Sequence, residues 1–347
     1  MHMKILLIGP YPPPHGGVSV HVSGIHLQLI AAGIPCRVLE TGRDRLGLGF
    51  GLVLLRHACQ GWTLHLHTNG HNLKSWLVAL GCGLAGLSSG GCILTLHSGM
   101  APGYLHAAPG WRRRLAAFVC SLYTRAIGVS DGIRNALLSL GLPPHRTEMV
   151  PAYLMTERPE ASLDPSILAW IGRHQPVLST TLFFRPEYGF DLLATAVARL
   201  SLRYPSLGCL VMGSGEQREQ AERRIHEMGL EETVLMLGDV NHDTCLALMS
   251  ASDVFVRPTL EDGDSISVRE ALALGVPVVA SDIGTRPAGA ILFQRGDIGE
   301  MLSKVELAMS SKRDPGVPAA DCMNRLIEIY QQVRGYSSEE SLCLNLK

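Results

Sequence analysis

The feature that most constrains the fold of this chain is a repeated alternation of short apolar runs with longer segments of helical period. The runs KILLIG, TLHLH and CILTLH have apolar residues on both faces, which is typical of strands in a parallel sheet. After the first run and a proline-rich loop, apolar positions recur at helical spacing over residues 18–33 and stop at Gly33. This order of strand, helix and strand predicts a parallel α/β sheet.

The same alternation begins again after an interruption. Prolines cluster and the periodicity lapses over residues 143–154, and a second series of strands and helices starts near residue 176. A chain of 347 residues is also the right length for two domains. We therefore predict two doubly wound, Rossmann-like α/β domains, at residues 1–150 and 151–320, followed by a helix and a polar tail at 321–347.

The composition excludes several classes of protein. The net charge is −1 and there is no basic tail, so no nucleic-acid partner is expected. The nine scattered cysteines form no CxxC pair, which favours a reducing, cytoplasmic location, and the 14 histidines lack the spacing of known zinc motifs. The apolar region 76–96 is interrupted by SSGG, so we expect a buried helix, a turn and a strand rather than a membrane span.

One acidic stretch, residues 257–282, predicts a ligand site. Asp262 and Asp264 lie in a loop after a predicted strand, and Ser267 and Glu270 fit a capping box, so a helix should start at 265–267. The first N–H groups of such a helix form a seat for phosphate at the carboxyl end of a strand. The residues expected to supply these groups are Gly263, Asp264, Ser265 and Ile266.

The acids of this stretch suit a ligand that carries hydroxyls on both sides of a phosphate. Asp262 and Glu270 bracket the predicted seat, and a carboxylate accepts hydrogen bonds from paired sugar hydroxyls. A nucleotide sugar is such a ligand. In the alternative interpretation, Glu270 only caps its helix and Asp262 only shapes a turn. The local sequence leaves both open.

The segments DGDSISVRE and ALALGVPVVAS together resemble the signature of retaining glycosyltransferases of the GT-B fold, family four. The resemblance extends in order to LVMGSGEQREQAERRIHEMGL, TVLMLGDV and LMSASDVFVRPT, and to GPYPPPHGGVSVHV, TLHSG and IGVSDGIRNAL in the first half. It implies an acceptor-side domain and a nucleotide-sugar-binding domain that face each other across a cleft. It further implies retaining transfer of a hexose-type sugar without a metal or another cofactor.

The resemblance also implies roles for individual residues. Glu270 would hold the donor ribose, Asp262 would contact the donor sugar, and the backbone of 263–267, including Ser267, would hold sugar and phosphate. His97 would bond to the sugar near the reacting carbon, so His97 and Asp262 are the predicted catalytic residues. His97 could equally be an ordinary histidine at the end of a strand.

Three glycines complete the predicted site, whereas two further histidines are expected to be structural. Gly16 and Gly17 would bring backbone N–H groups to the diphosphate or the acceptor, and the backbone around Gly238 would read the base. We expect His65 and His67 to alternate between the two faces of their strand and to be structural.

The chain departs from the family where an arginine and a lysine usually grip the diphosphate. Tyr188 stands at the lysine position and Phe183 at or near the arginine position. Arg185 is the predicted substitute. The alternatives are Arg257, Arg269 and Arg295.

The sequence therefore predicts sugar transfer from a nucleotide-diphosphate sugar to a hydroxyl of a carbohydrate or lipid-linked acceptor, in bacterial-type surface polysaccharide or glycolipid synthesis. The alternatives are a nucleotide-sugar epimerase of the same fold and a non-catalytic nucleotide-sugar-binding protein. A nicotinamide oxidoreductase is disfavoured because GPYPPPHGG lacks the GxGxxG spacing. Trp111–Arg114 could place the protein on the cytoplasmic face of a membrane, or could be a solvated turn before a core helix.

Overall fold

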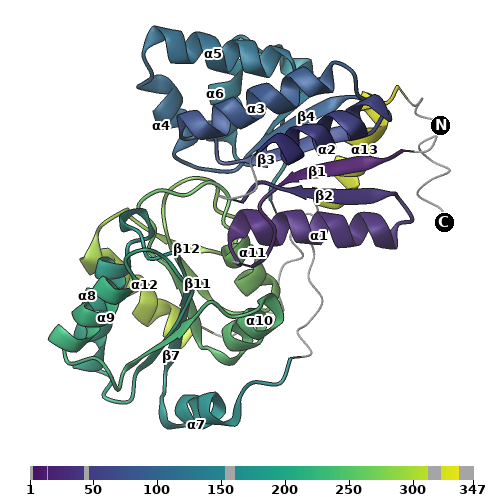
Figure 1. Ribbon diagram of the computed structural model, residues 1–347. Helices are drawn as coiled ribbons and strands as arrows, with labels where there is room; N and C mark the ends of the chain where they lie inside the picture. Colours follow the sequence, from purple (N-terminus) through teal and green to yellow (C-terminus); the bar gives the residue numbers. More distant parts are fainter. Residues whose placement is uncertain (1–2, 14, 43–46, 153–160, 312–321, 336–347) are drawn as a thin grey trace. The chain divides into compact units, whose positions relative to one another are not determined.

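The computed structural model describes residues 3–13, 15–42, 47–152, 161–311 and 322–335 (Figure 1). The chain forms two compact units. The first comprises residues 1–13, 18–154 and 321–347, and the second comprises residues 14–17 and 155–320. Each unit is built on one six-stranded sheet in which every pairing is parallel. The predicted α/β class with two parallel sheets is confirmed.

The first sheet has the strand order β2-β1-β3-β4-β5-β6. Every residue of the inner strand β1 is buried, as the continuous apolar run predicted. The strands are β1 Ile5–Gly9, β2 Cys36–Glu40, β3 Thr63–Thr68, β4 Cys92–Leu96, β5 Arg125–Gly128 and β6 Thr147–Met149. The helices are α1 Gly17–Ala31, α2 Leu48–Cys59, α3 Leu73–Gly86, α4 Ala101–His106, α5 Gly110–Ser121, α6 Asp131–Ser139 and α13 Cys322–Val333.

The last described helix, α13, packs into the first unit. Figure 1 shows it in yellow beside the purple elements of that unit. Its residues Leu326 and Ile329 share one apolar core with Ile5 of β1 and with Ile25 and Leu29 of α1. The sequence prediction assigned this helix to neither domain, because an amphipathic helix does not reveal which core it covers.

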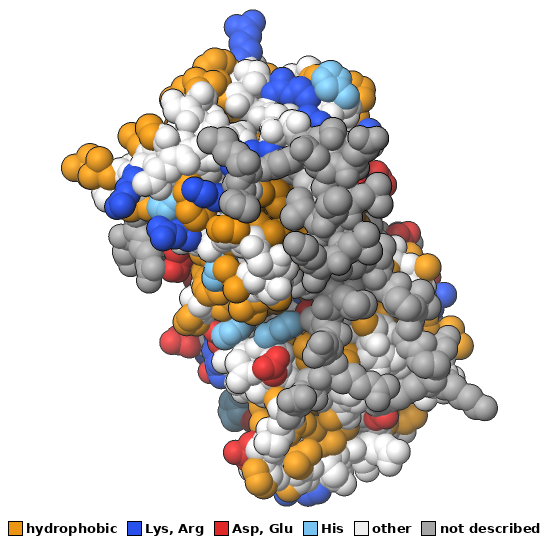
Figure 2. All heavy atoms as spheres, turned by 90° about the vertical axis from the view of Figure 1, so that its right-hand side faces the viewer, with side chains coloured by type: hydrophobic (Ala, Val, Ile, Leu, Met, Phe, Trp, Pro, Cys, Tyr) orange, Lys and Arg blue, Asp and Glu red, His pale blue; other side chains and the backbone are white. Residues whose placement is uncertain are grey.

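The first unit also carries apolar side chains on its surface. On α2, Leu48 is 91% exposed and Leu52 is 69% exposed. On α5, Trp111 and Phe118 are more than half exposed. Figure 2 shows hydrophobic side chains interspersed with Lys and Arg over this part of the molecule.

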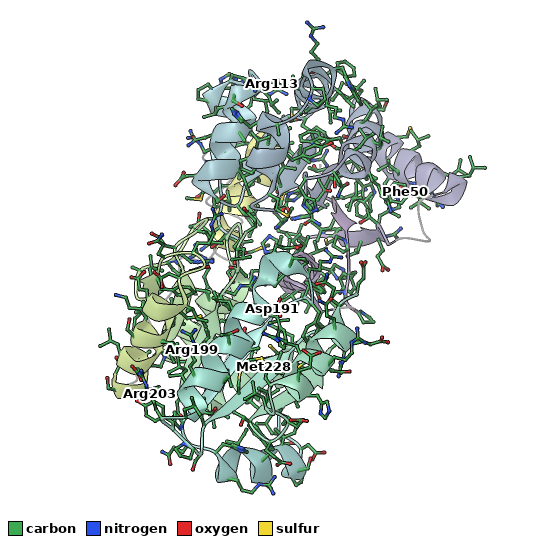
Figure 3. All side chains as sticks on the ribbon, turned by 90° about the vertical axis from the view of Figure 1, so that its left-hand side faces the viewer. Phe50, Arg113, Asp191, Arg199, Arg203 and Met228 are labelled. Carbon is green, nitrogen blue, oxygen red and sulfur yellow. The ribbon has the colours of Figure 1, made fainter. Side chains whose placement is uncertain are left out.

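The second sheet has the order β12-β11-β10-β7-β8-β9. One apolar core includes residues of α8, α9 and α12, and another includes residues of α7, α10 and α11. Figure 3 looks onto α8, on which Asp191 lies in the first turn and Arg199 in the last. The strands are β7 Val177–Thr181, β8 Gly208–Met212, β9 Val234–Gly238, β10 Val254–Arg257, β11 Val278–Ser281 and β12 Ile291–Phe293. The helices are α7 Pro165–Arg173, α8 Phe190–Ser201, α9 Arg218–Glu227, α10 His242–Ala251, α11 Ile266–Ala273 and α12 Ile298–Ser310.

Both sheets contain a point at which the chain reverses the direction in which strands are added. In the first sheet this point lies between β1 and β3, and in the second it lies between β7 and β10. Loops that leave the carboxyl ends of strands on either side of such a point diverge and leave room for a ligand. The topology therefore predicts that a ligand would bind at the carboxyl edge of either sheet, beside β1 and β3 or beside β7 and β10.

The apolar region 76–96 folds as the sequence predicted. It contributes the second half of a strand-to-helix-to-strand unit, with α3 ending at Gly86 and β4 beginning at Cys92. Among the described residues, every helix is too short or too polar to cross a bilayer.

Candidate functional site

Two arginines converge on one carboxylate at the carboxyl edge of the second sheet. Arg257 ends β10, donates from Nη1 to the Thr181 carbonyl at the end of β7 (2.6 Å), and donates from Nε to Oδ2 of Asp262 (3.1 Å). Arg286, in the loop after β11, donates from Nη1 to the same oxygen (3.1 Å). We call Arg257, Asp262 and Arg286 the arginine cluster.

Backbone contacts hold together the two loops that form this cluster. The N–H of Thr285 donates to the carbonyl of Gly263 (2.8 Å). Gly284 has a φ of 62°, and a Cβ there would lie 2.3 Å from the carbonyl oxygen of Gly263. The approach of the loops therefore requires glycine at 284, both for its conformation and for the space.

The electrostatics of the cluster favour an anion. Burial alone would raise the pKa of Asp262, but Arg257 and Arg286 outweigh it and lower that pKa. Burial lowers the pKa of Arg286. The negative charge of Asp262 offsets this lowering only in part, because the positive charge of Arg257 also lowers the pKa of Arg286. One carboxylate between two guanidinium groups leaves one positive charge uncompensated, and a bound anion would balance it.

Aromatic rings occupy the positions where the resemblance expects the arginine and the lysine. The guanidinium carbon of Arg257 lies 5.1 Å from the ring centre of Tyr188, and Phe183 packs edge to face against Tyr188. Arg185, the predicted substitute, is exposed and lies over the Phe183 ring at 5.9 Å. Two arginines are thus held by stacking on this aromatic pair.

The helix α11 begins within the predicted interval, with Ser265 as its N-cap, but the predicted capping box is wrong. The hydroxyl of Ser265 bonds to that of Ser267 (3.2 Å), and Oε1 of Glu270 bonds to Nε2 of His242 at the start of α10 (2.6 Å). Glu270 therefore lies two residues beyond the position that a capping box requires. Burial alone would lower the pKa of His242, but its hydrogen bond and charge interaction with Glu270 raise it.

The predicted phosphate seat lies beside the arginine cluster. The first N–H groups of α11, from Ile266 onward, have no acceptor within the helix. The N–H of Gly263 is already engaged, because it donates to Oδ1 of Asp262 (3.1 Å). The carboxylate of Asp264 is fully buried and accepts from Nε of Arg269 (2.7 Å), which leaves this acid as part of the scaffold.

The other candidate cations differ in their surroundings. Arg269 pairs with Asp264, and Arg295 forms an exposed pair with Glu261. Arg286, which is buried at the centre of the cluster, was absent from the sequence prediction. The sequence could have suggested Arg286, because it follows the end of β11 by five residues. The strand β11 lies next to β10 in the sheet, so the loops after the two strands leave the same edge.

The predicted glycines have different local roles. Gly238 ends β9 with a φ of 75°, and a Cβ there would lie 2.6 Å from Nη1 of Arg218. Gly17 is the first residue of α1, directly after Gly16, and a Cβ at Gly17 would meet no atom within 4 Å. Gly238 is therefore favoured by its left-handed backbone, since the Arg218 side chain could move aside, whereas Gly17 has neither constraint.

The predicted catalytic histidine belongs to a group of buried imidazoles in the first unit. His97 directly follows β4, and its Nε2 lies 3.0 Å from Nδ1 of His67 at the end of β3. The expectation that His65 and His67 face opposite sides is wrong, because residues two apart in a strand share a face and their ring centres lie 4.0 Å apart. Burial lowers the pKa of His65 to about 3, assisted by the nearby charge of His21, and lowers the pKa of His21 to about 4.

A comparison with protein families identifies the segment that contains the arginine cluster. Residues 176–296 match the family model described as glycosyl transferases group 1. This segment is therefore similar to the group 1 glycosyltransferases, and we call it the group 1 domain. The match covers β7 through β12 and includes Arg257, Asp262, Glu270 and Arg286.

Curated proteins are similar to about half of the chain. The gpi3 subunit of phosphatidylinositol N-acetylglucosaminyltransferase from Schizosaccharomyces pombe is 26% identical over 188 residues, which is 53% of this chain and 40% of the relative. The 2-deoxystreptamine glucosyltransferase of Streptomyces kanamyceticus is 26% identical over 187 residues, covering 51% of this chain and 46% of the relative. The chain thus spans less than half the length of these relatives.

Solved structures match both units as well as the group 1 domain. Sucrose-phosphate synthase from Thermosynechococcus elongatus has a TM-score of 0.72 at 17% identity and covers 97% of this chain and 100% of that one. Anabaena Alr3699/HepE, solved in complex with UDP-glucose, has a TM-score of 0.70 at 18% identity and covers 99% and 97%. The protein has the GT-B fold of these glycosyltransferases.

Proposed function

We propose that this protein transfers a hexose-type sugar from a nucleotide-diphosphate sugar to an acceptor hydroxyl, with retention at the anomeric carbon and without a metal in the transfer step. The group 1 domain and the fold support this class of reaction. The single observation that carries it is the arginine cluster, where two guanidinium groups share one carboxylate beside the N-terminus of α11.

The cluster suits the leaving diphosphate, which gains negative charge as the sugar–phosphate bond breaks. Arg257 and Arg286 are already fixed by their bonds to Thr181, Thr259 and Ser281, so little reorganisation is needed when charge develops. We infer that these two arginines, with Arg185, replace the arginine and lysine that the family usually carries. Asp262 then acts by holding both arginines, and Glu270, positioned by His242, takes the ribose hydroxyls.

The proposal is tested by donor binding to wild type and to Arg286→Gln. UDP-glucose and GDP-mannose are suitable probes, because one similar structure was solved with UDP-glucose and one curated relative is described as GDP-mannose-dependent. Loss of a charge-assisted bond of about 1.5–3 kcal/mol predicts an affinity about ten- to hundredfold lower. Arg295→Gln is the matched control, because Arg295 also pairs with a carboxylate but is exposed.

Turnover separates this function from the alternatives. Transfer to an acceptor or slow hydrolysis of the donor supports the transferase. Release of an epimerised sugar nucleotide would indicate an epimerase, and binding without turnover would indicate a non-catalytic binding protein. Equal donor affinity in wild type and Arg286→Gln would contradict the proposal that the arginine cluster binds the donor diphosphate.

We further propose that the acceptor is a carbohydrate or a lipid-linked carbohydrate, met at the cytoplasmic face of a membrane during synthesis of a surface polysaccharide or glycolipid. Trp111, Arg114 and Phe118 recur at positions that share one face of α5, and all three are exposed. Arg113 is less suited to this role, because its Nη2 donates to the carbonyl of Ser139 (2.7 Å).

Co-sedimentation with vesicles of acidic lipid tests the membrane contact. Binding should weaken in the double variant Trp111→Ala with Arg114→Gln, because the variant loses an apolar anchor and a charge. Leu202→Ala is the control, because Leu202 is also highly exposed but lies in the second unit. If wild type does not co-sediment with such vesicles, the proposed membrane contact is excluded.

A further inference from the structure

Three imidazoles meet at the carboxyl edge of the first sheet, beside the point where strand order reverses. His21 comes from α1, His67 from the end of β3, and His97 directly follows β4. One ring nitrogen of each lies within 4.8 Å of those of the other two. All three side chains are buried, so the cluster is part of the interior rather than a surface grouping.

The arrangement of the rings matches that of ligands around one small ion. The ring centres are 5.5 Å apart for His21 and His67, 5.3 Å for His21 and His97, and 5.3 Å for His67 and His97. Three imidazoles that bind a tetrahedral ion at about 2.0–2.1 Å have ring centres about 5 Å apart. The cluster is therefore close to an equilateral triangle of the size that a bound Zn²⁺ produces.

Hydrogen bonds within the protein do not satisfy these rings. One bond joins His67 and His97, while Nδ1 of His21 and Nε2 of His67 are buried without a partner among the described residues. The neighbouring His65 differs, because its Nδ1 bonds to the hydroxyl of Tyr330 (2.7 Å) and its Nε2 to that of Thr95 (2.8 Å). A buried polar atom without a partner calls for a ligand, and His65 shows that this fold can satisfy an imidazole where no ligand is needed.

The chemistry of the donor set selects the type of ion. All three donors are imidazole nitrogens, and a neutral imidazole offers one lone pair to a metal ion. Imidazole nitrogen suits Zn²⁺ and similar transition metals, whereas Mg²⁺ and Ca²⁺ require oxygen ligands. The three ligands are far apart in the sequence, which is why a search for zinc spacing motifs does not find them.

We propose that His21, His67 and His97 bind one Zn²⁺ or a similar transition-metal ion that ties the first turns of α1 to the ends of β3 and β4. Three protein ligands leave a fourth position for water or an exogenous ligand. The ion would stabilise the first unit whether or not the second unit binds a donor, but it would replace the role predicted for His97 toward the sugar. When the ion is bound, His97 is engaged by it rather than by a sugar.

Metal content is the first test, made on the full chain without a histidine tag. After chelator treatment, addition of Zn²⁺ and extensive dialysis, we expect about one equivalent of zinc per chain. Co²⁺ should give the intense visible absorption of a tetrahedral site. His67→Gln should lower the affinity at least about tenfold, because even ligand-orienting residues contribute that much. His106→Gln is the control, because His106 is exposed and lies on α4.

Thermal unfolding of the wild-type protein gives a second readout that does not depend on the variants folding. Zn²⁺ should raise the midpoint relative to chelator, and X-ray absorption should give a first shell with three imidazole nitrogens. The proposal is overturned if folded wild type retains no metal, if wild type and folded His67→Gln retain equal amounts, or if the shell lacks three imidazoles.

Discussion

The two units place opposite kinds of side chain at equivalent places. At the carboxyl edge of its sheet, the first unit gathers uncharged imidazoles around His67, whereas the second gathers arginines around Asp262. The strand order reverses beside both groups. Parallel topology thus fixes where a ligand can bind, and the side chains decide its class. Neutral nitrogen atoms suit a metal ion, and excess positive charge suits a phosphate.

The largest effect should follow from breaking the charged group. Asp262→Ala leaves Arg257 and Arg286 buried without their shared carboxylate, which should cost about 3–5 kcal/mol of unfolding free energy. Glu261→Ala is the control, because its exposed pair with Arg295 should contribute about 1 kcal/mol or less. Urea unfolding measures both. Similar losses for the two neighbouring acids would contradict the burial argument.

The loop that carries Arg286 gives the next largest effect. Gly284→Ala places a Cβ against the Gly263 carbonyl and requires alanine to adopt a positive φ. The substitution should therefore cost about 2–4 kcal/mol of unfolding free energy. Gly296→Ala has a similar φ of 79° but an open Cβ position, and should cost about 1–2 kcal/mol. The difference in unfolding free energy isolates the steric part. Without a difference, the two loops do not constrain each other.

In the first unit, a smaller effect should follow from removing a hydrogen-bond partner of His65. Tyr330→Phe removes the hydroxyl bonded to His65 and should cost about 1–3 kcal/mol, because a buried ring nitrogen loses its partner. Tyr11→Phe is the matched control, because it removes only a longer, part-buried bond to His26 (3.3 Å). Denaturant unfolding compares them. Equal, negligible losses would show that hydrogen bonding is unimportant at these histidines.

The smallest effect is a pH dependence in the second unit. Burial alone would lower the pKa of His242, but Glu270 raises it above the ordinary 6.5. The stabilisation is therefore complete below pH 6.5 and is lost as the pH rises through the folded value. The advantage of wild type over His242→Gln should be about 1 kcal/mol or less and should shrink as the pH rises above 6.5. An advantage that grows with pH would contradict the assignment.

Much of the fold could be predicted from the sequence, because buried parallel strands and amphipathic helices leave periodic patterns. Helices α2, α4, α7 and α12 were not predicted. The helix α2 exposes leucines such as Leu48 and Leu52, so it lacks a clear amphipathic period. The start of α11 lies in the predicted interval, although the capping box from which it was predicted does not form.

The site was harder to predict, because its contacts join residues that are distant in sequence. Glu270 bonds to His242, 28 residues earlier, instead of capping its own helix. Asp262 bonds to Arg286, 24 residues later, across two loops. A local motif can identify the acids, but it does not reveal which cation will reach them. The roles predicted for Asp262, Glu270 and His97 toward a donor remain predictions.

The packing of α13 against β1 and α1 has a consequence for biosynthesis. Residues 322–333 complete a core that begins at residue 3, so the first unit cannot finish folding until the ribosome has made the whole second unit. The second unit is contiguous from residue 155 to 320, apart from residues 14–17, and can fold earlier. The nascent N-terminal half must therefore wait with part of its apolar surface uncovered, and this interval is when chaperones would be most needed.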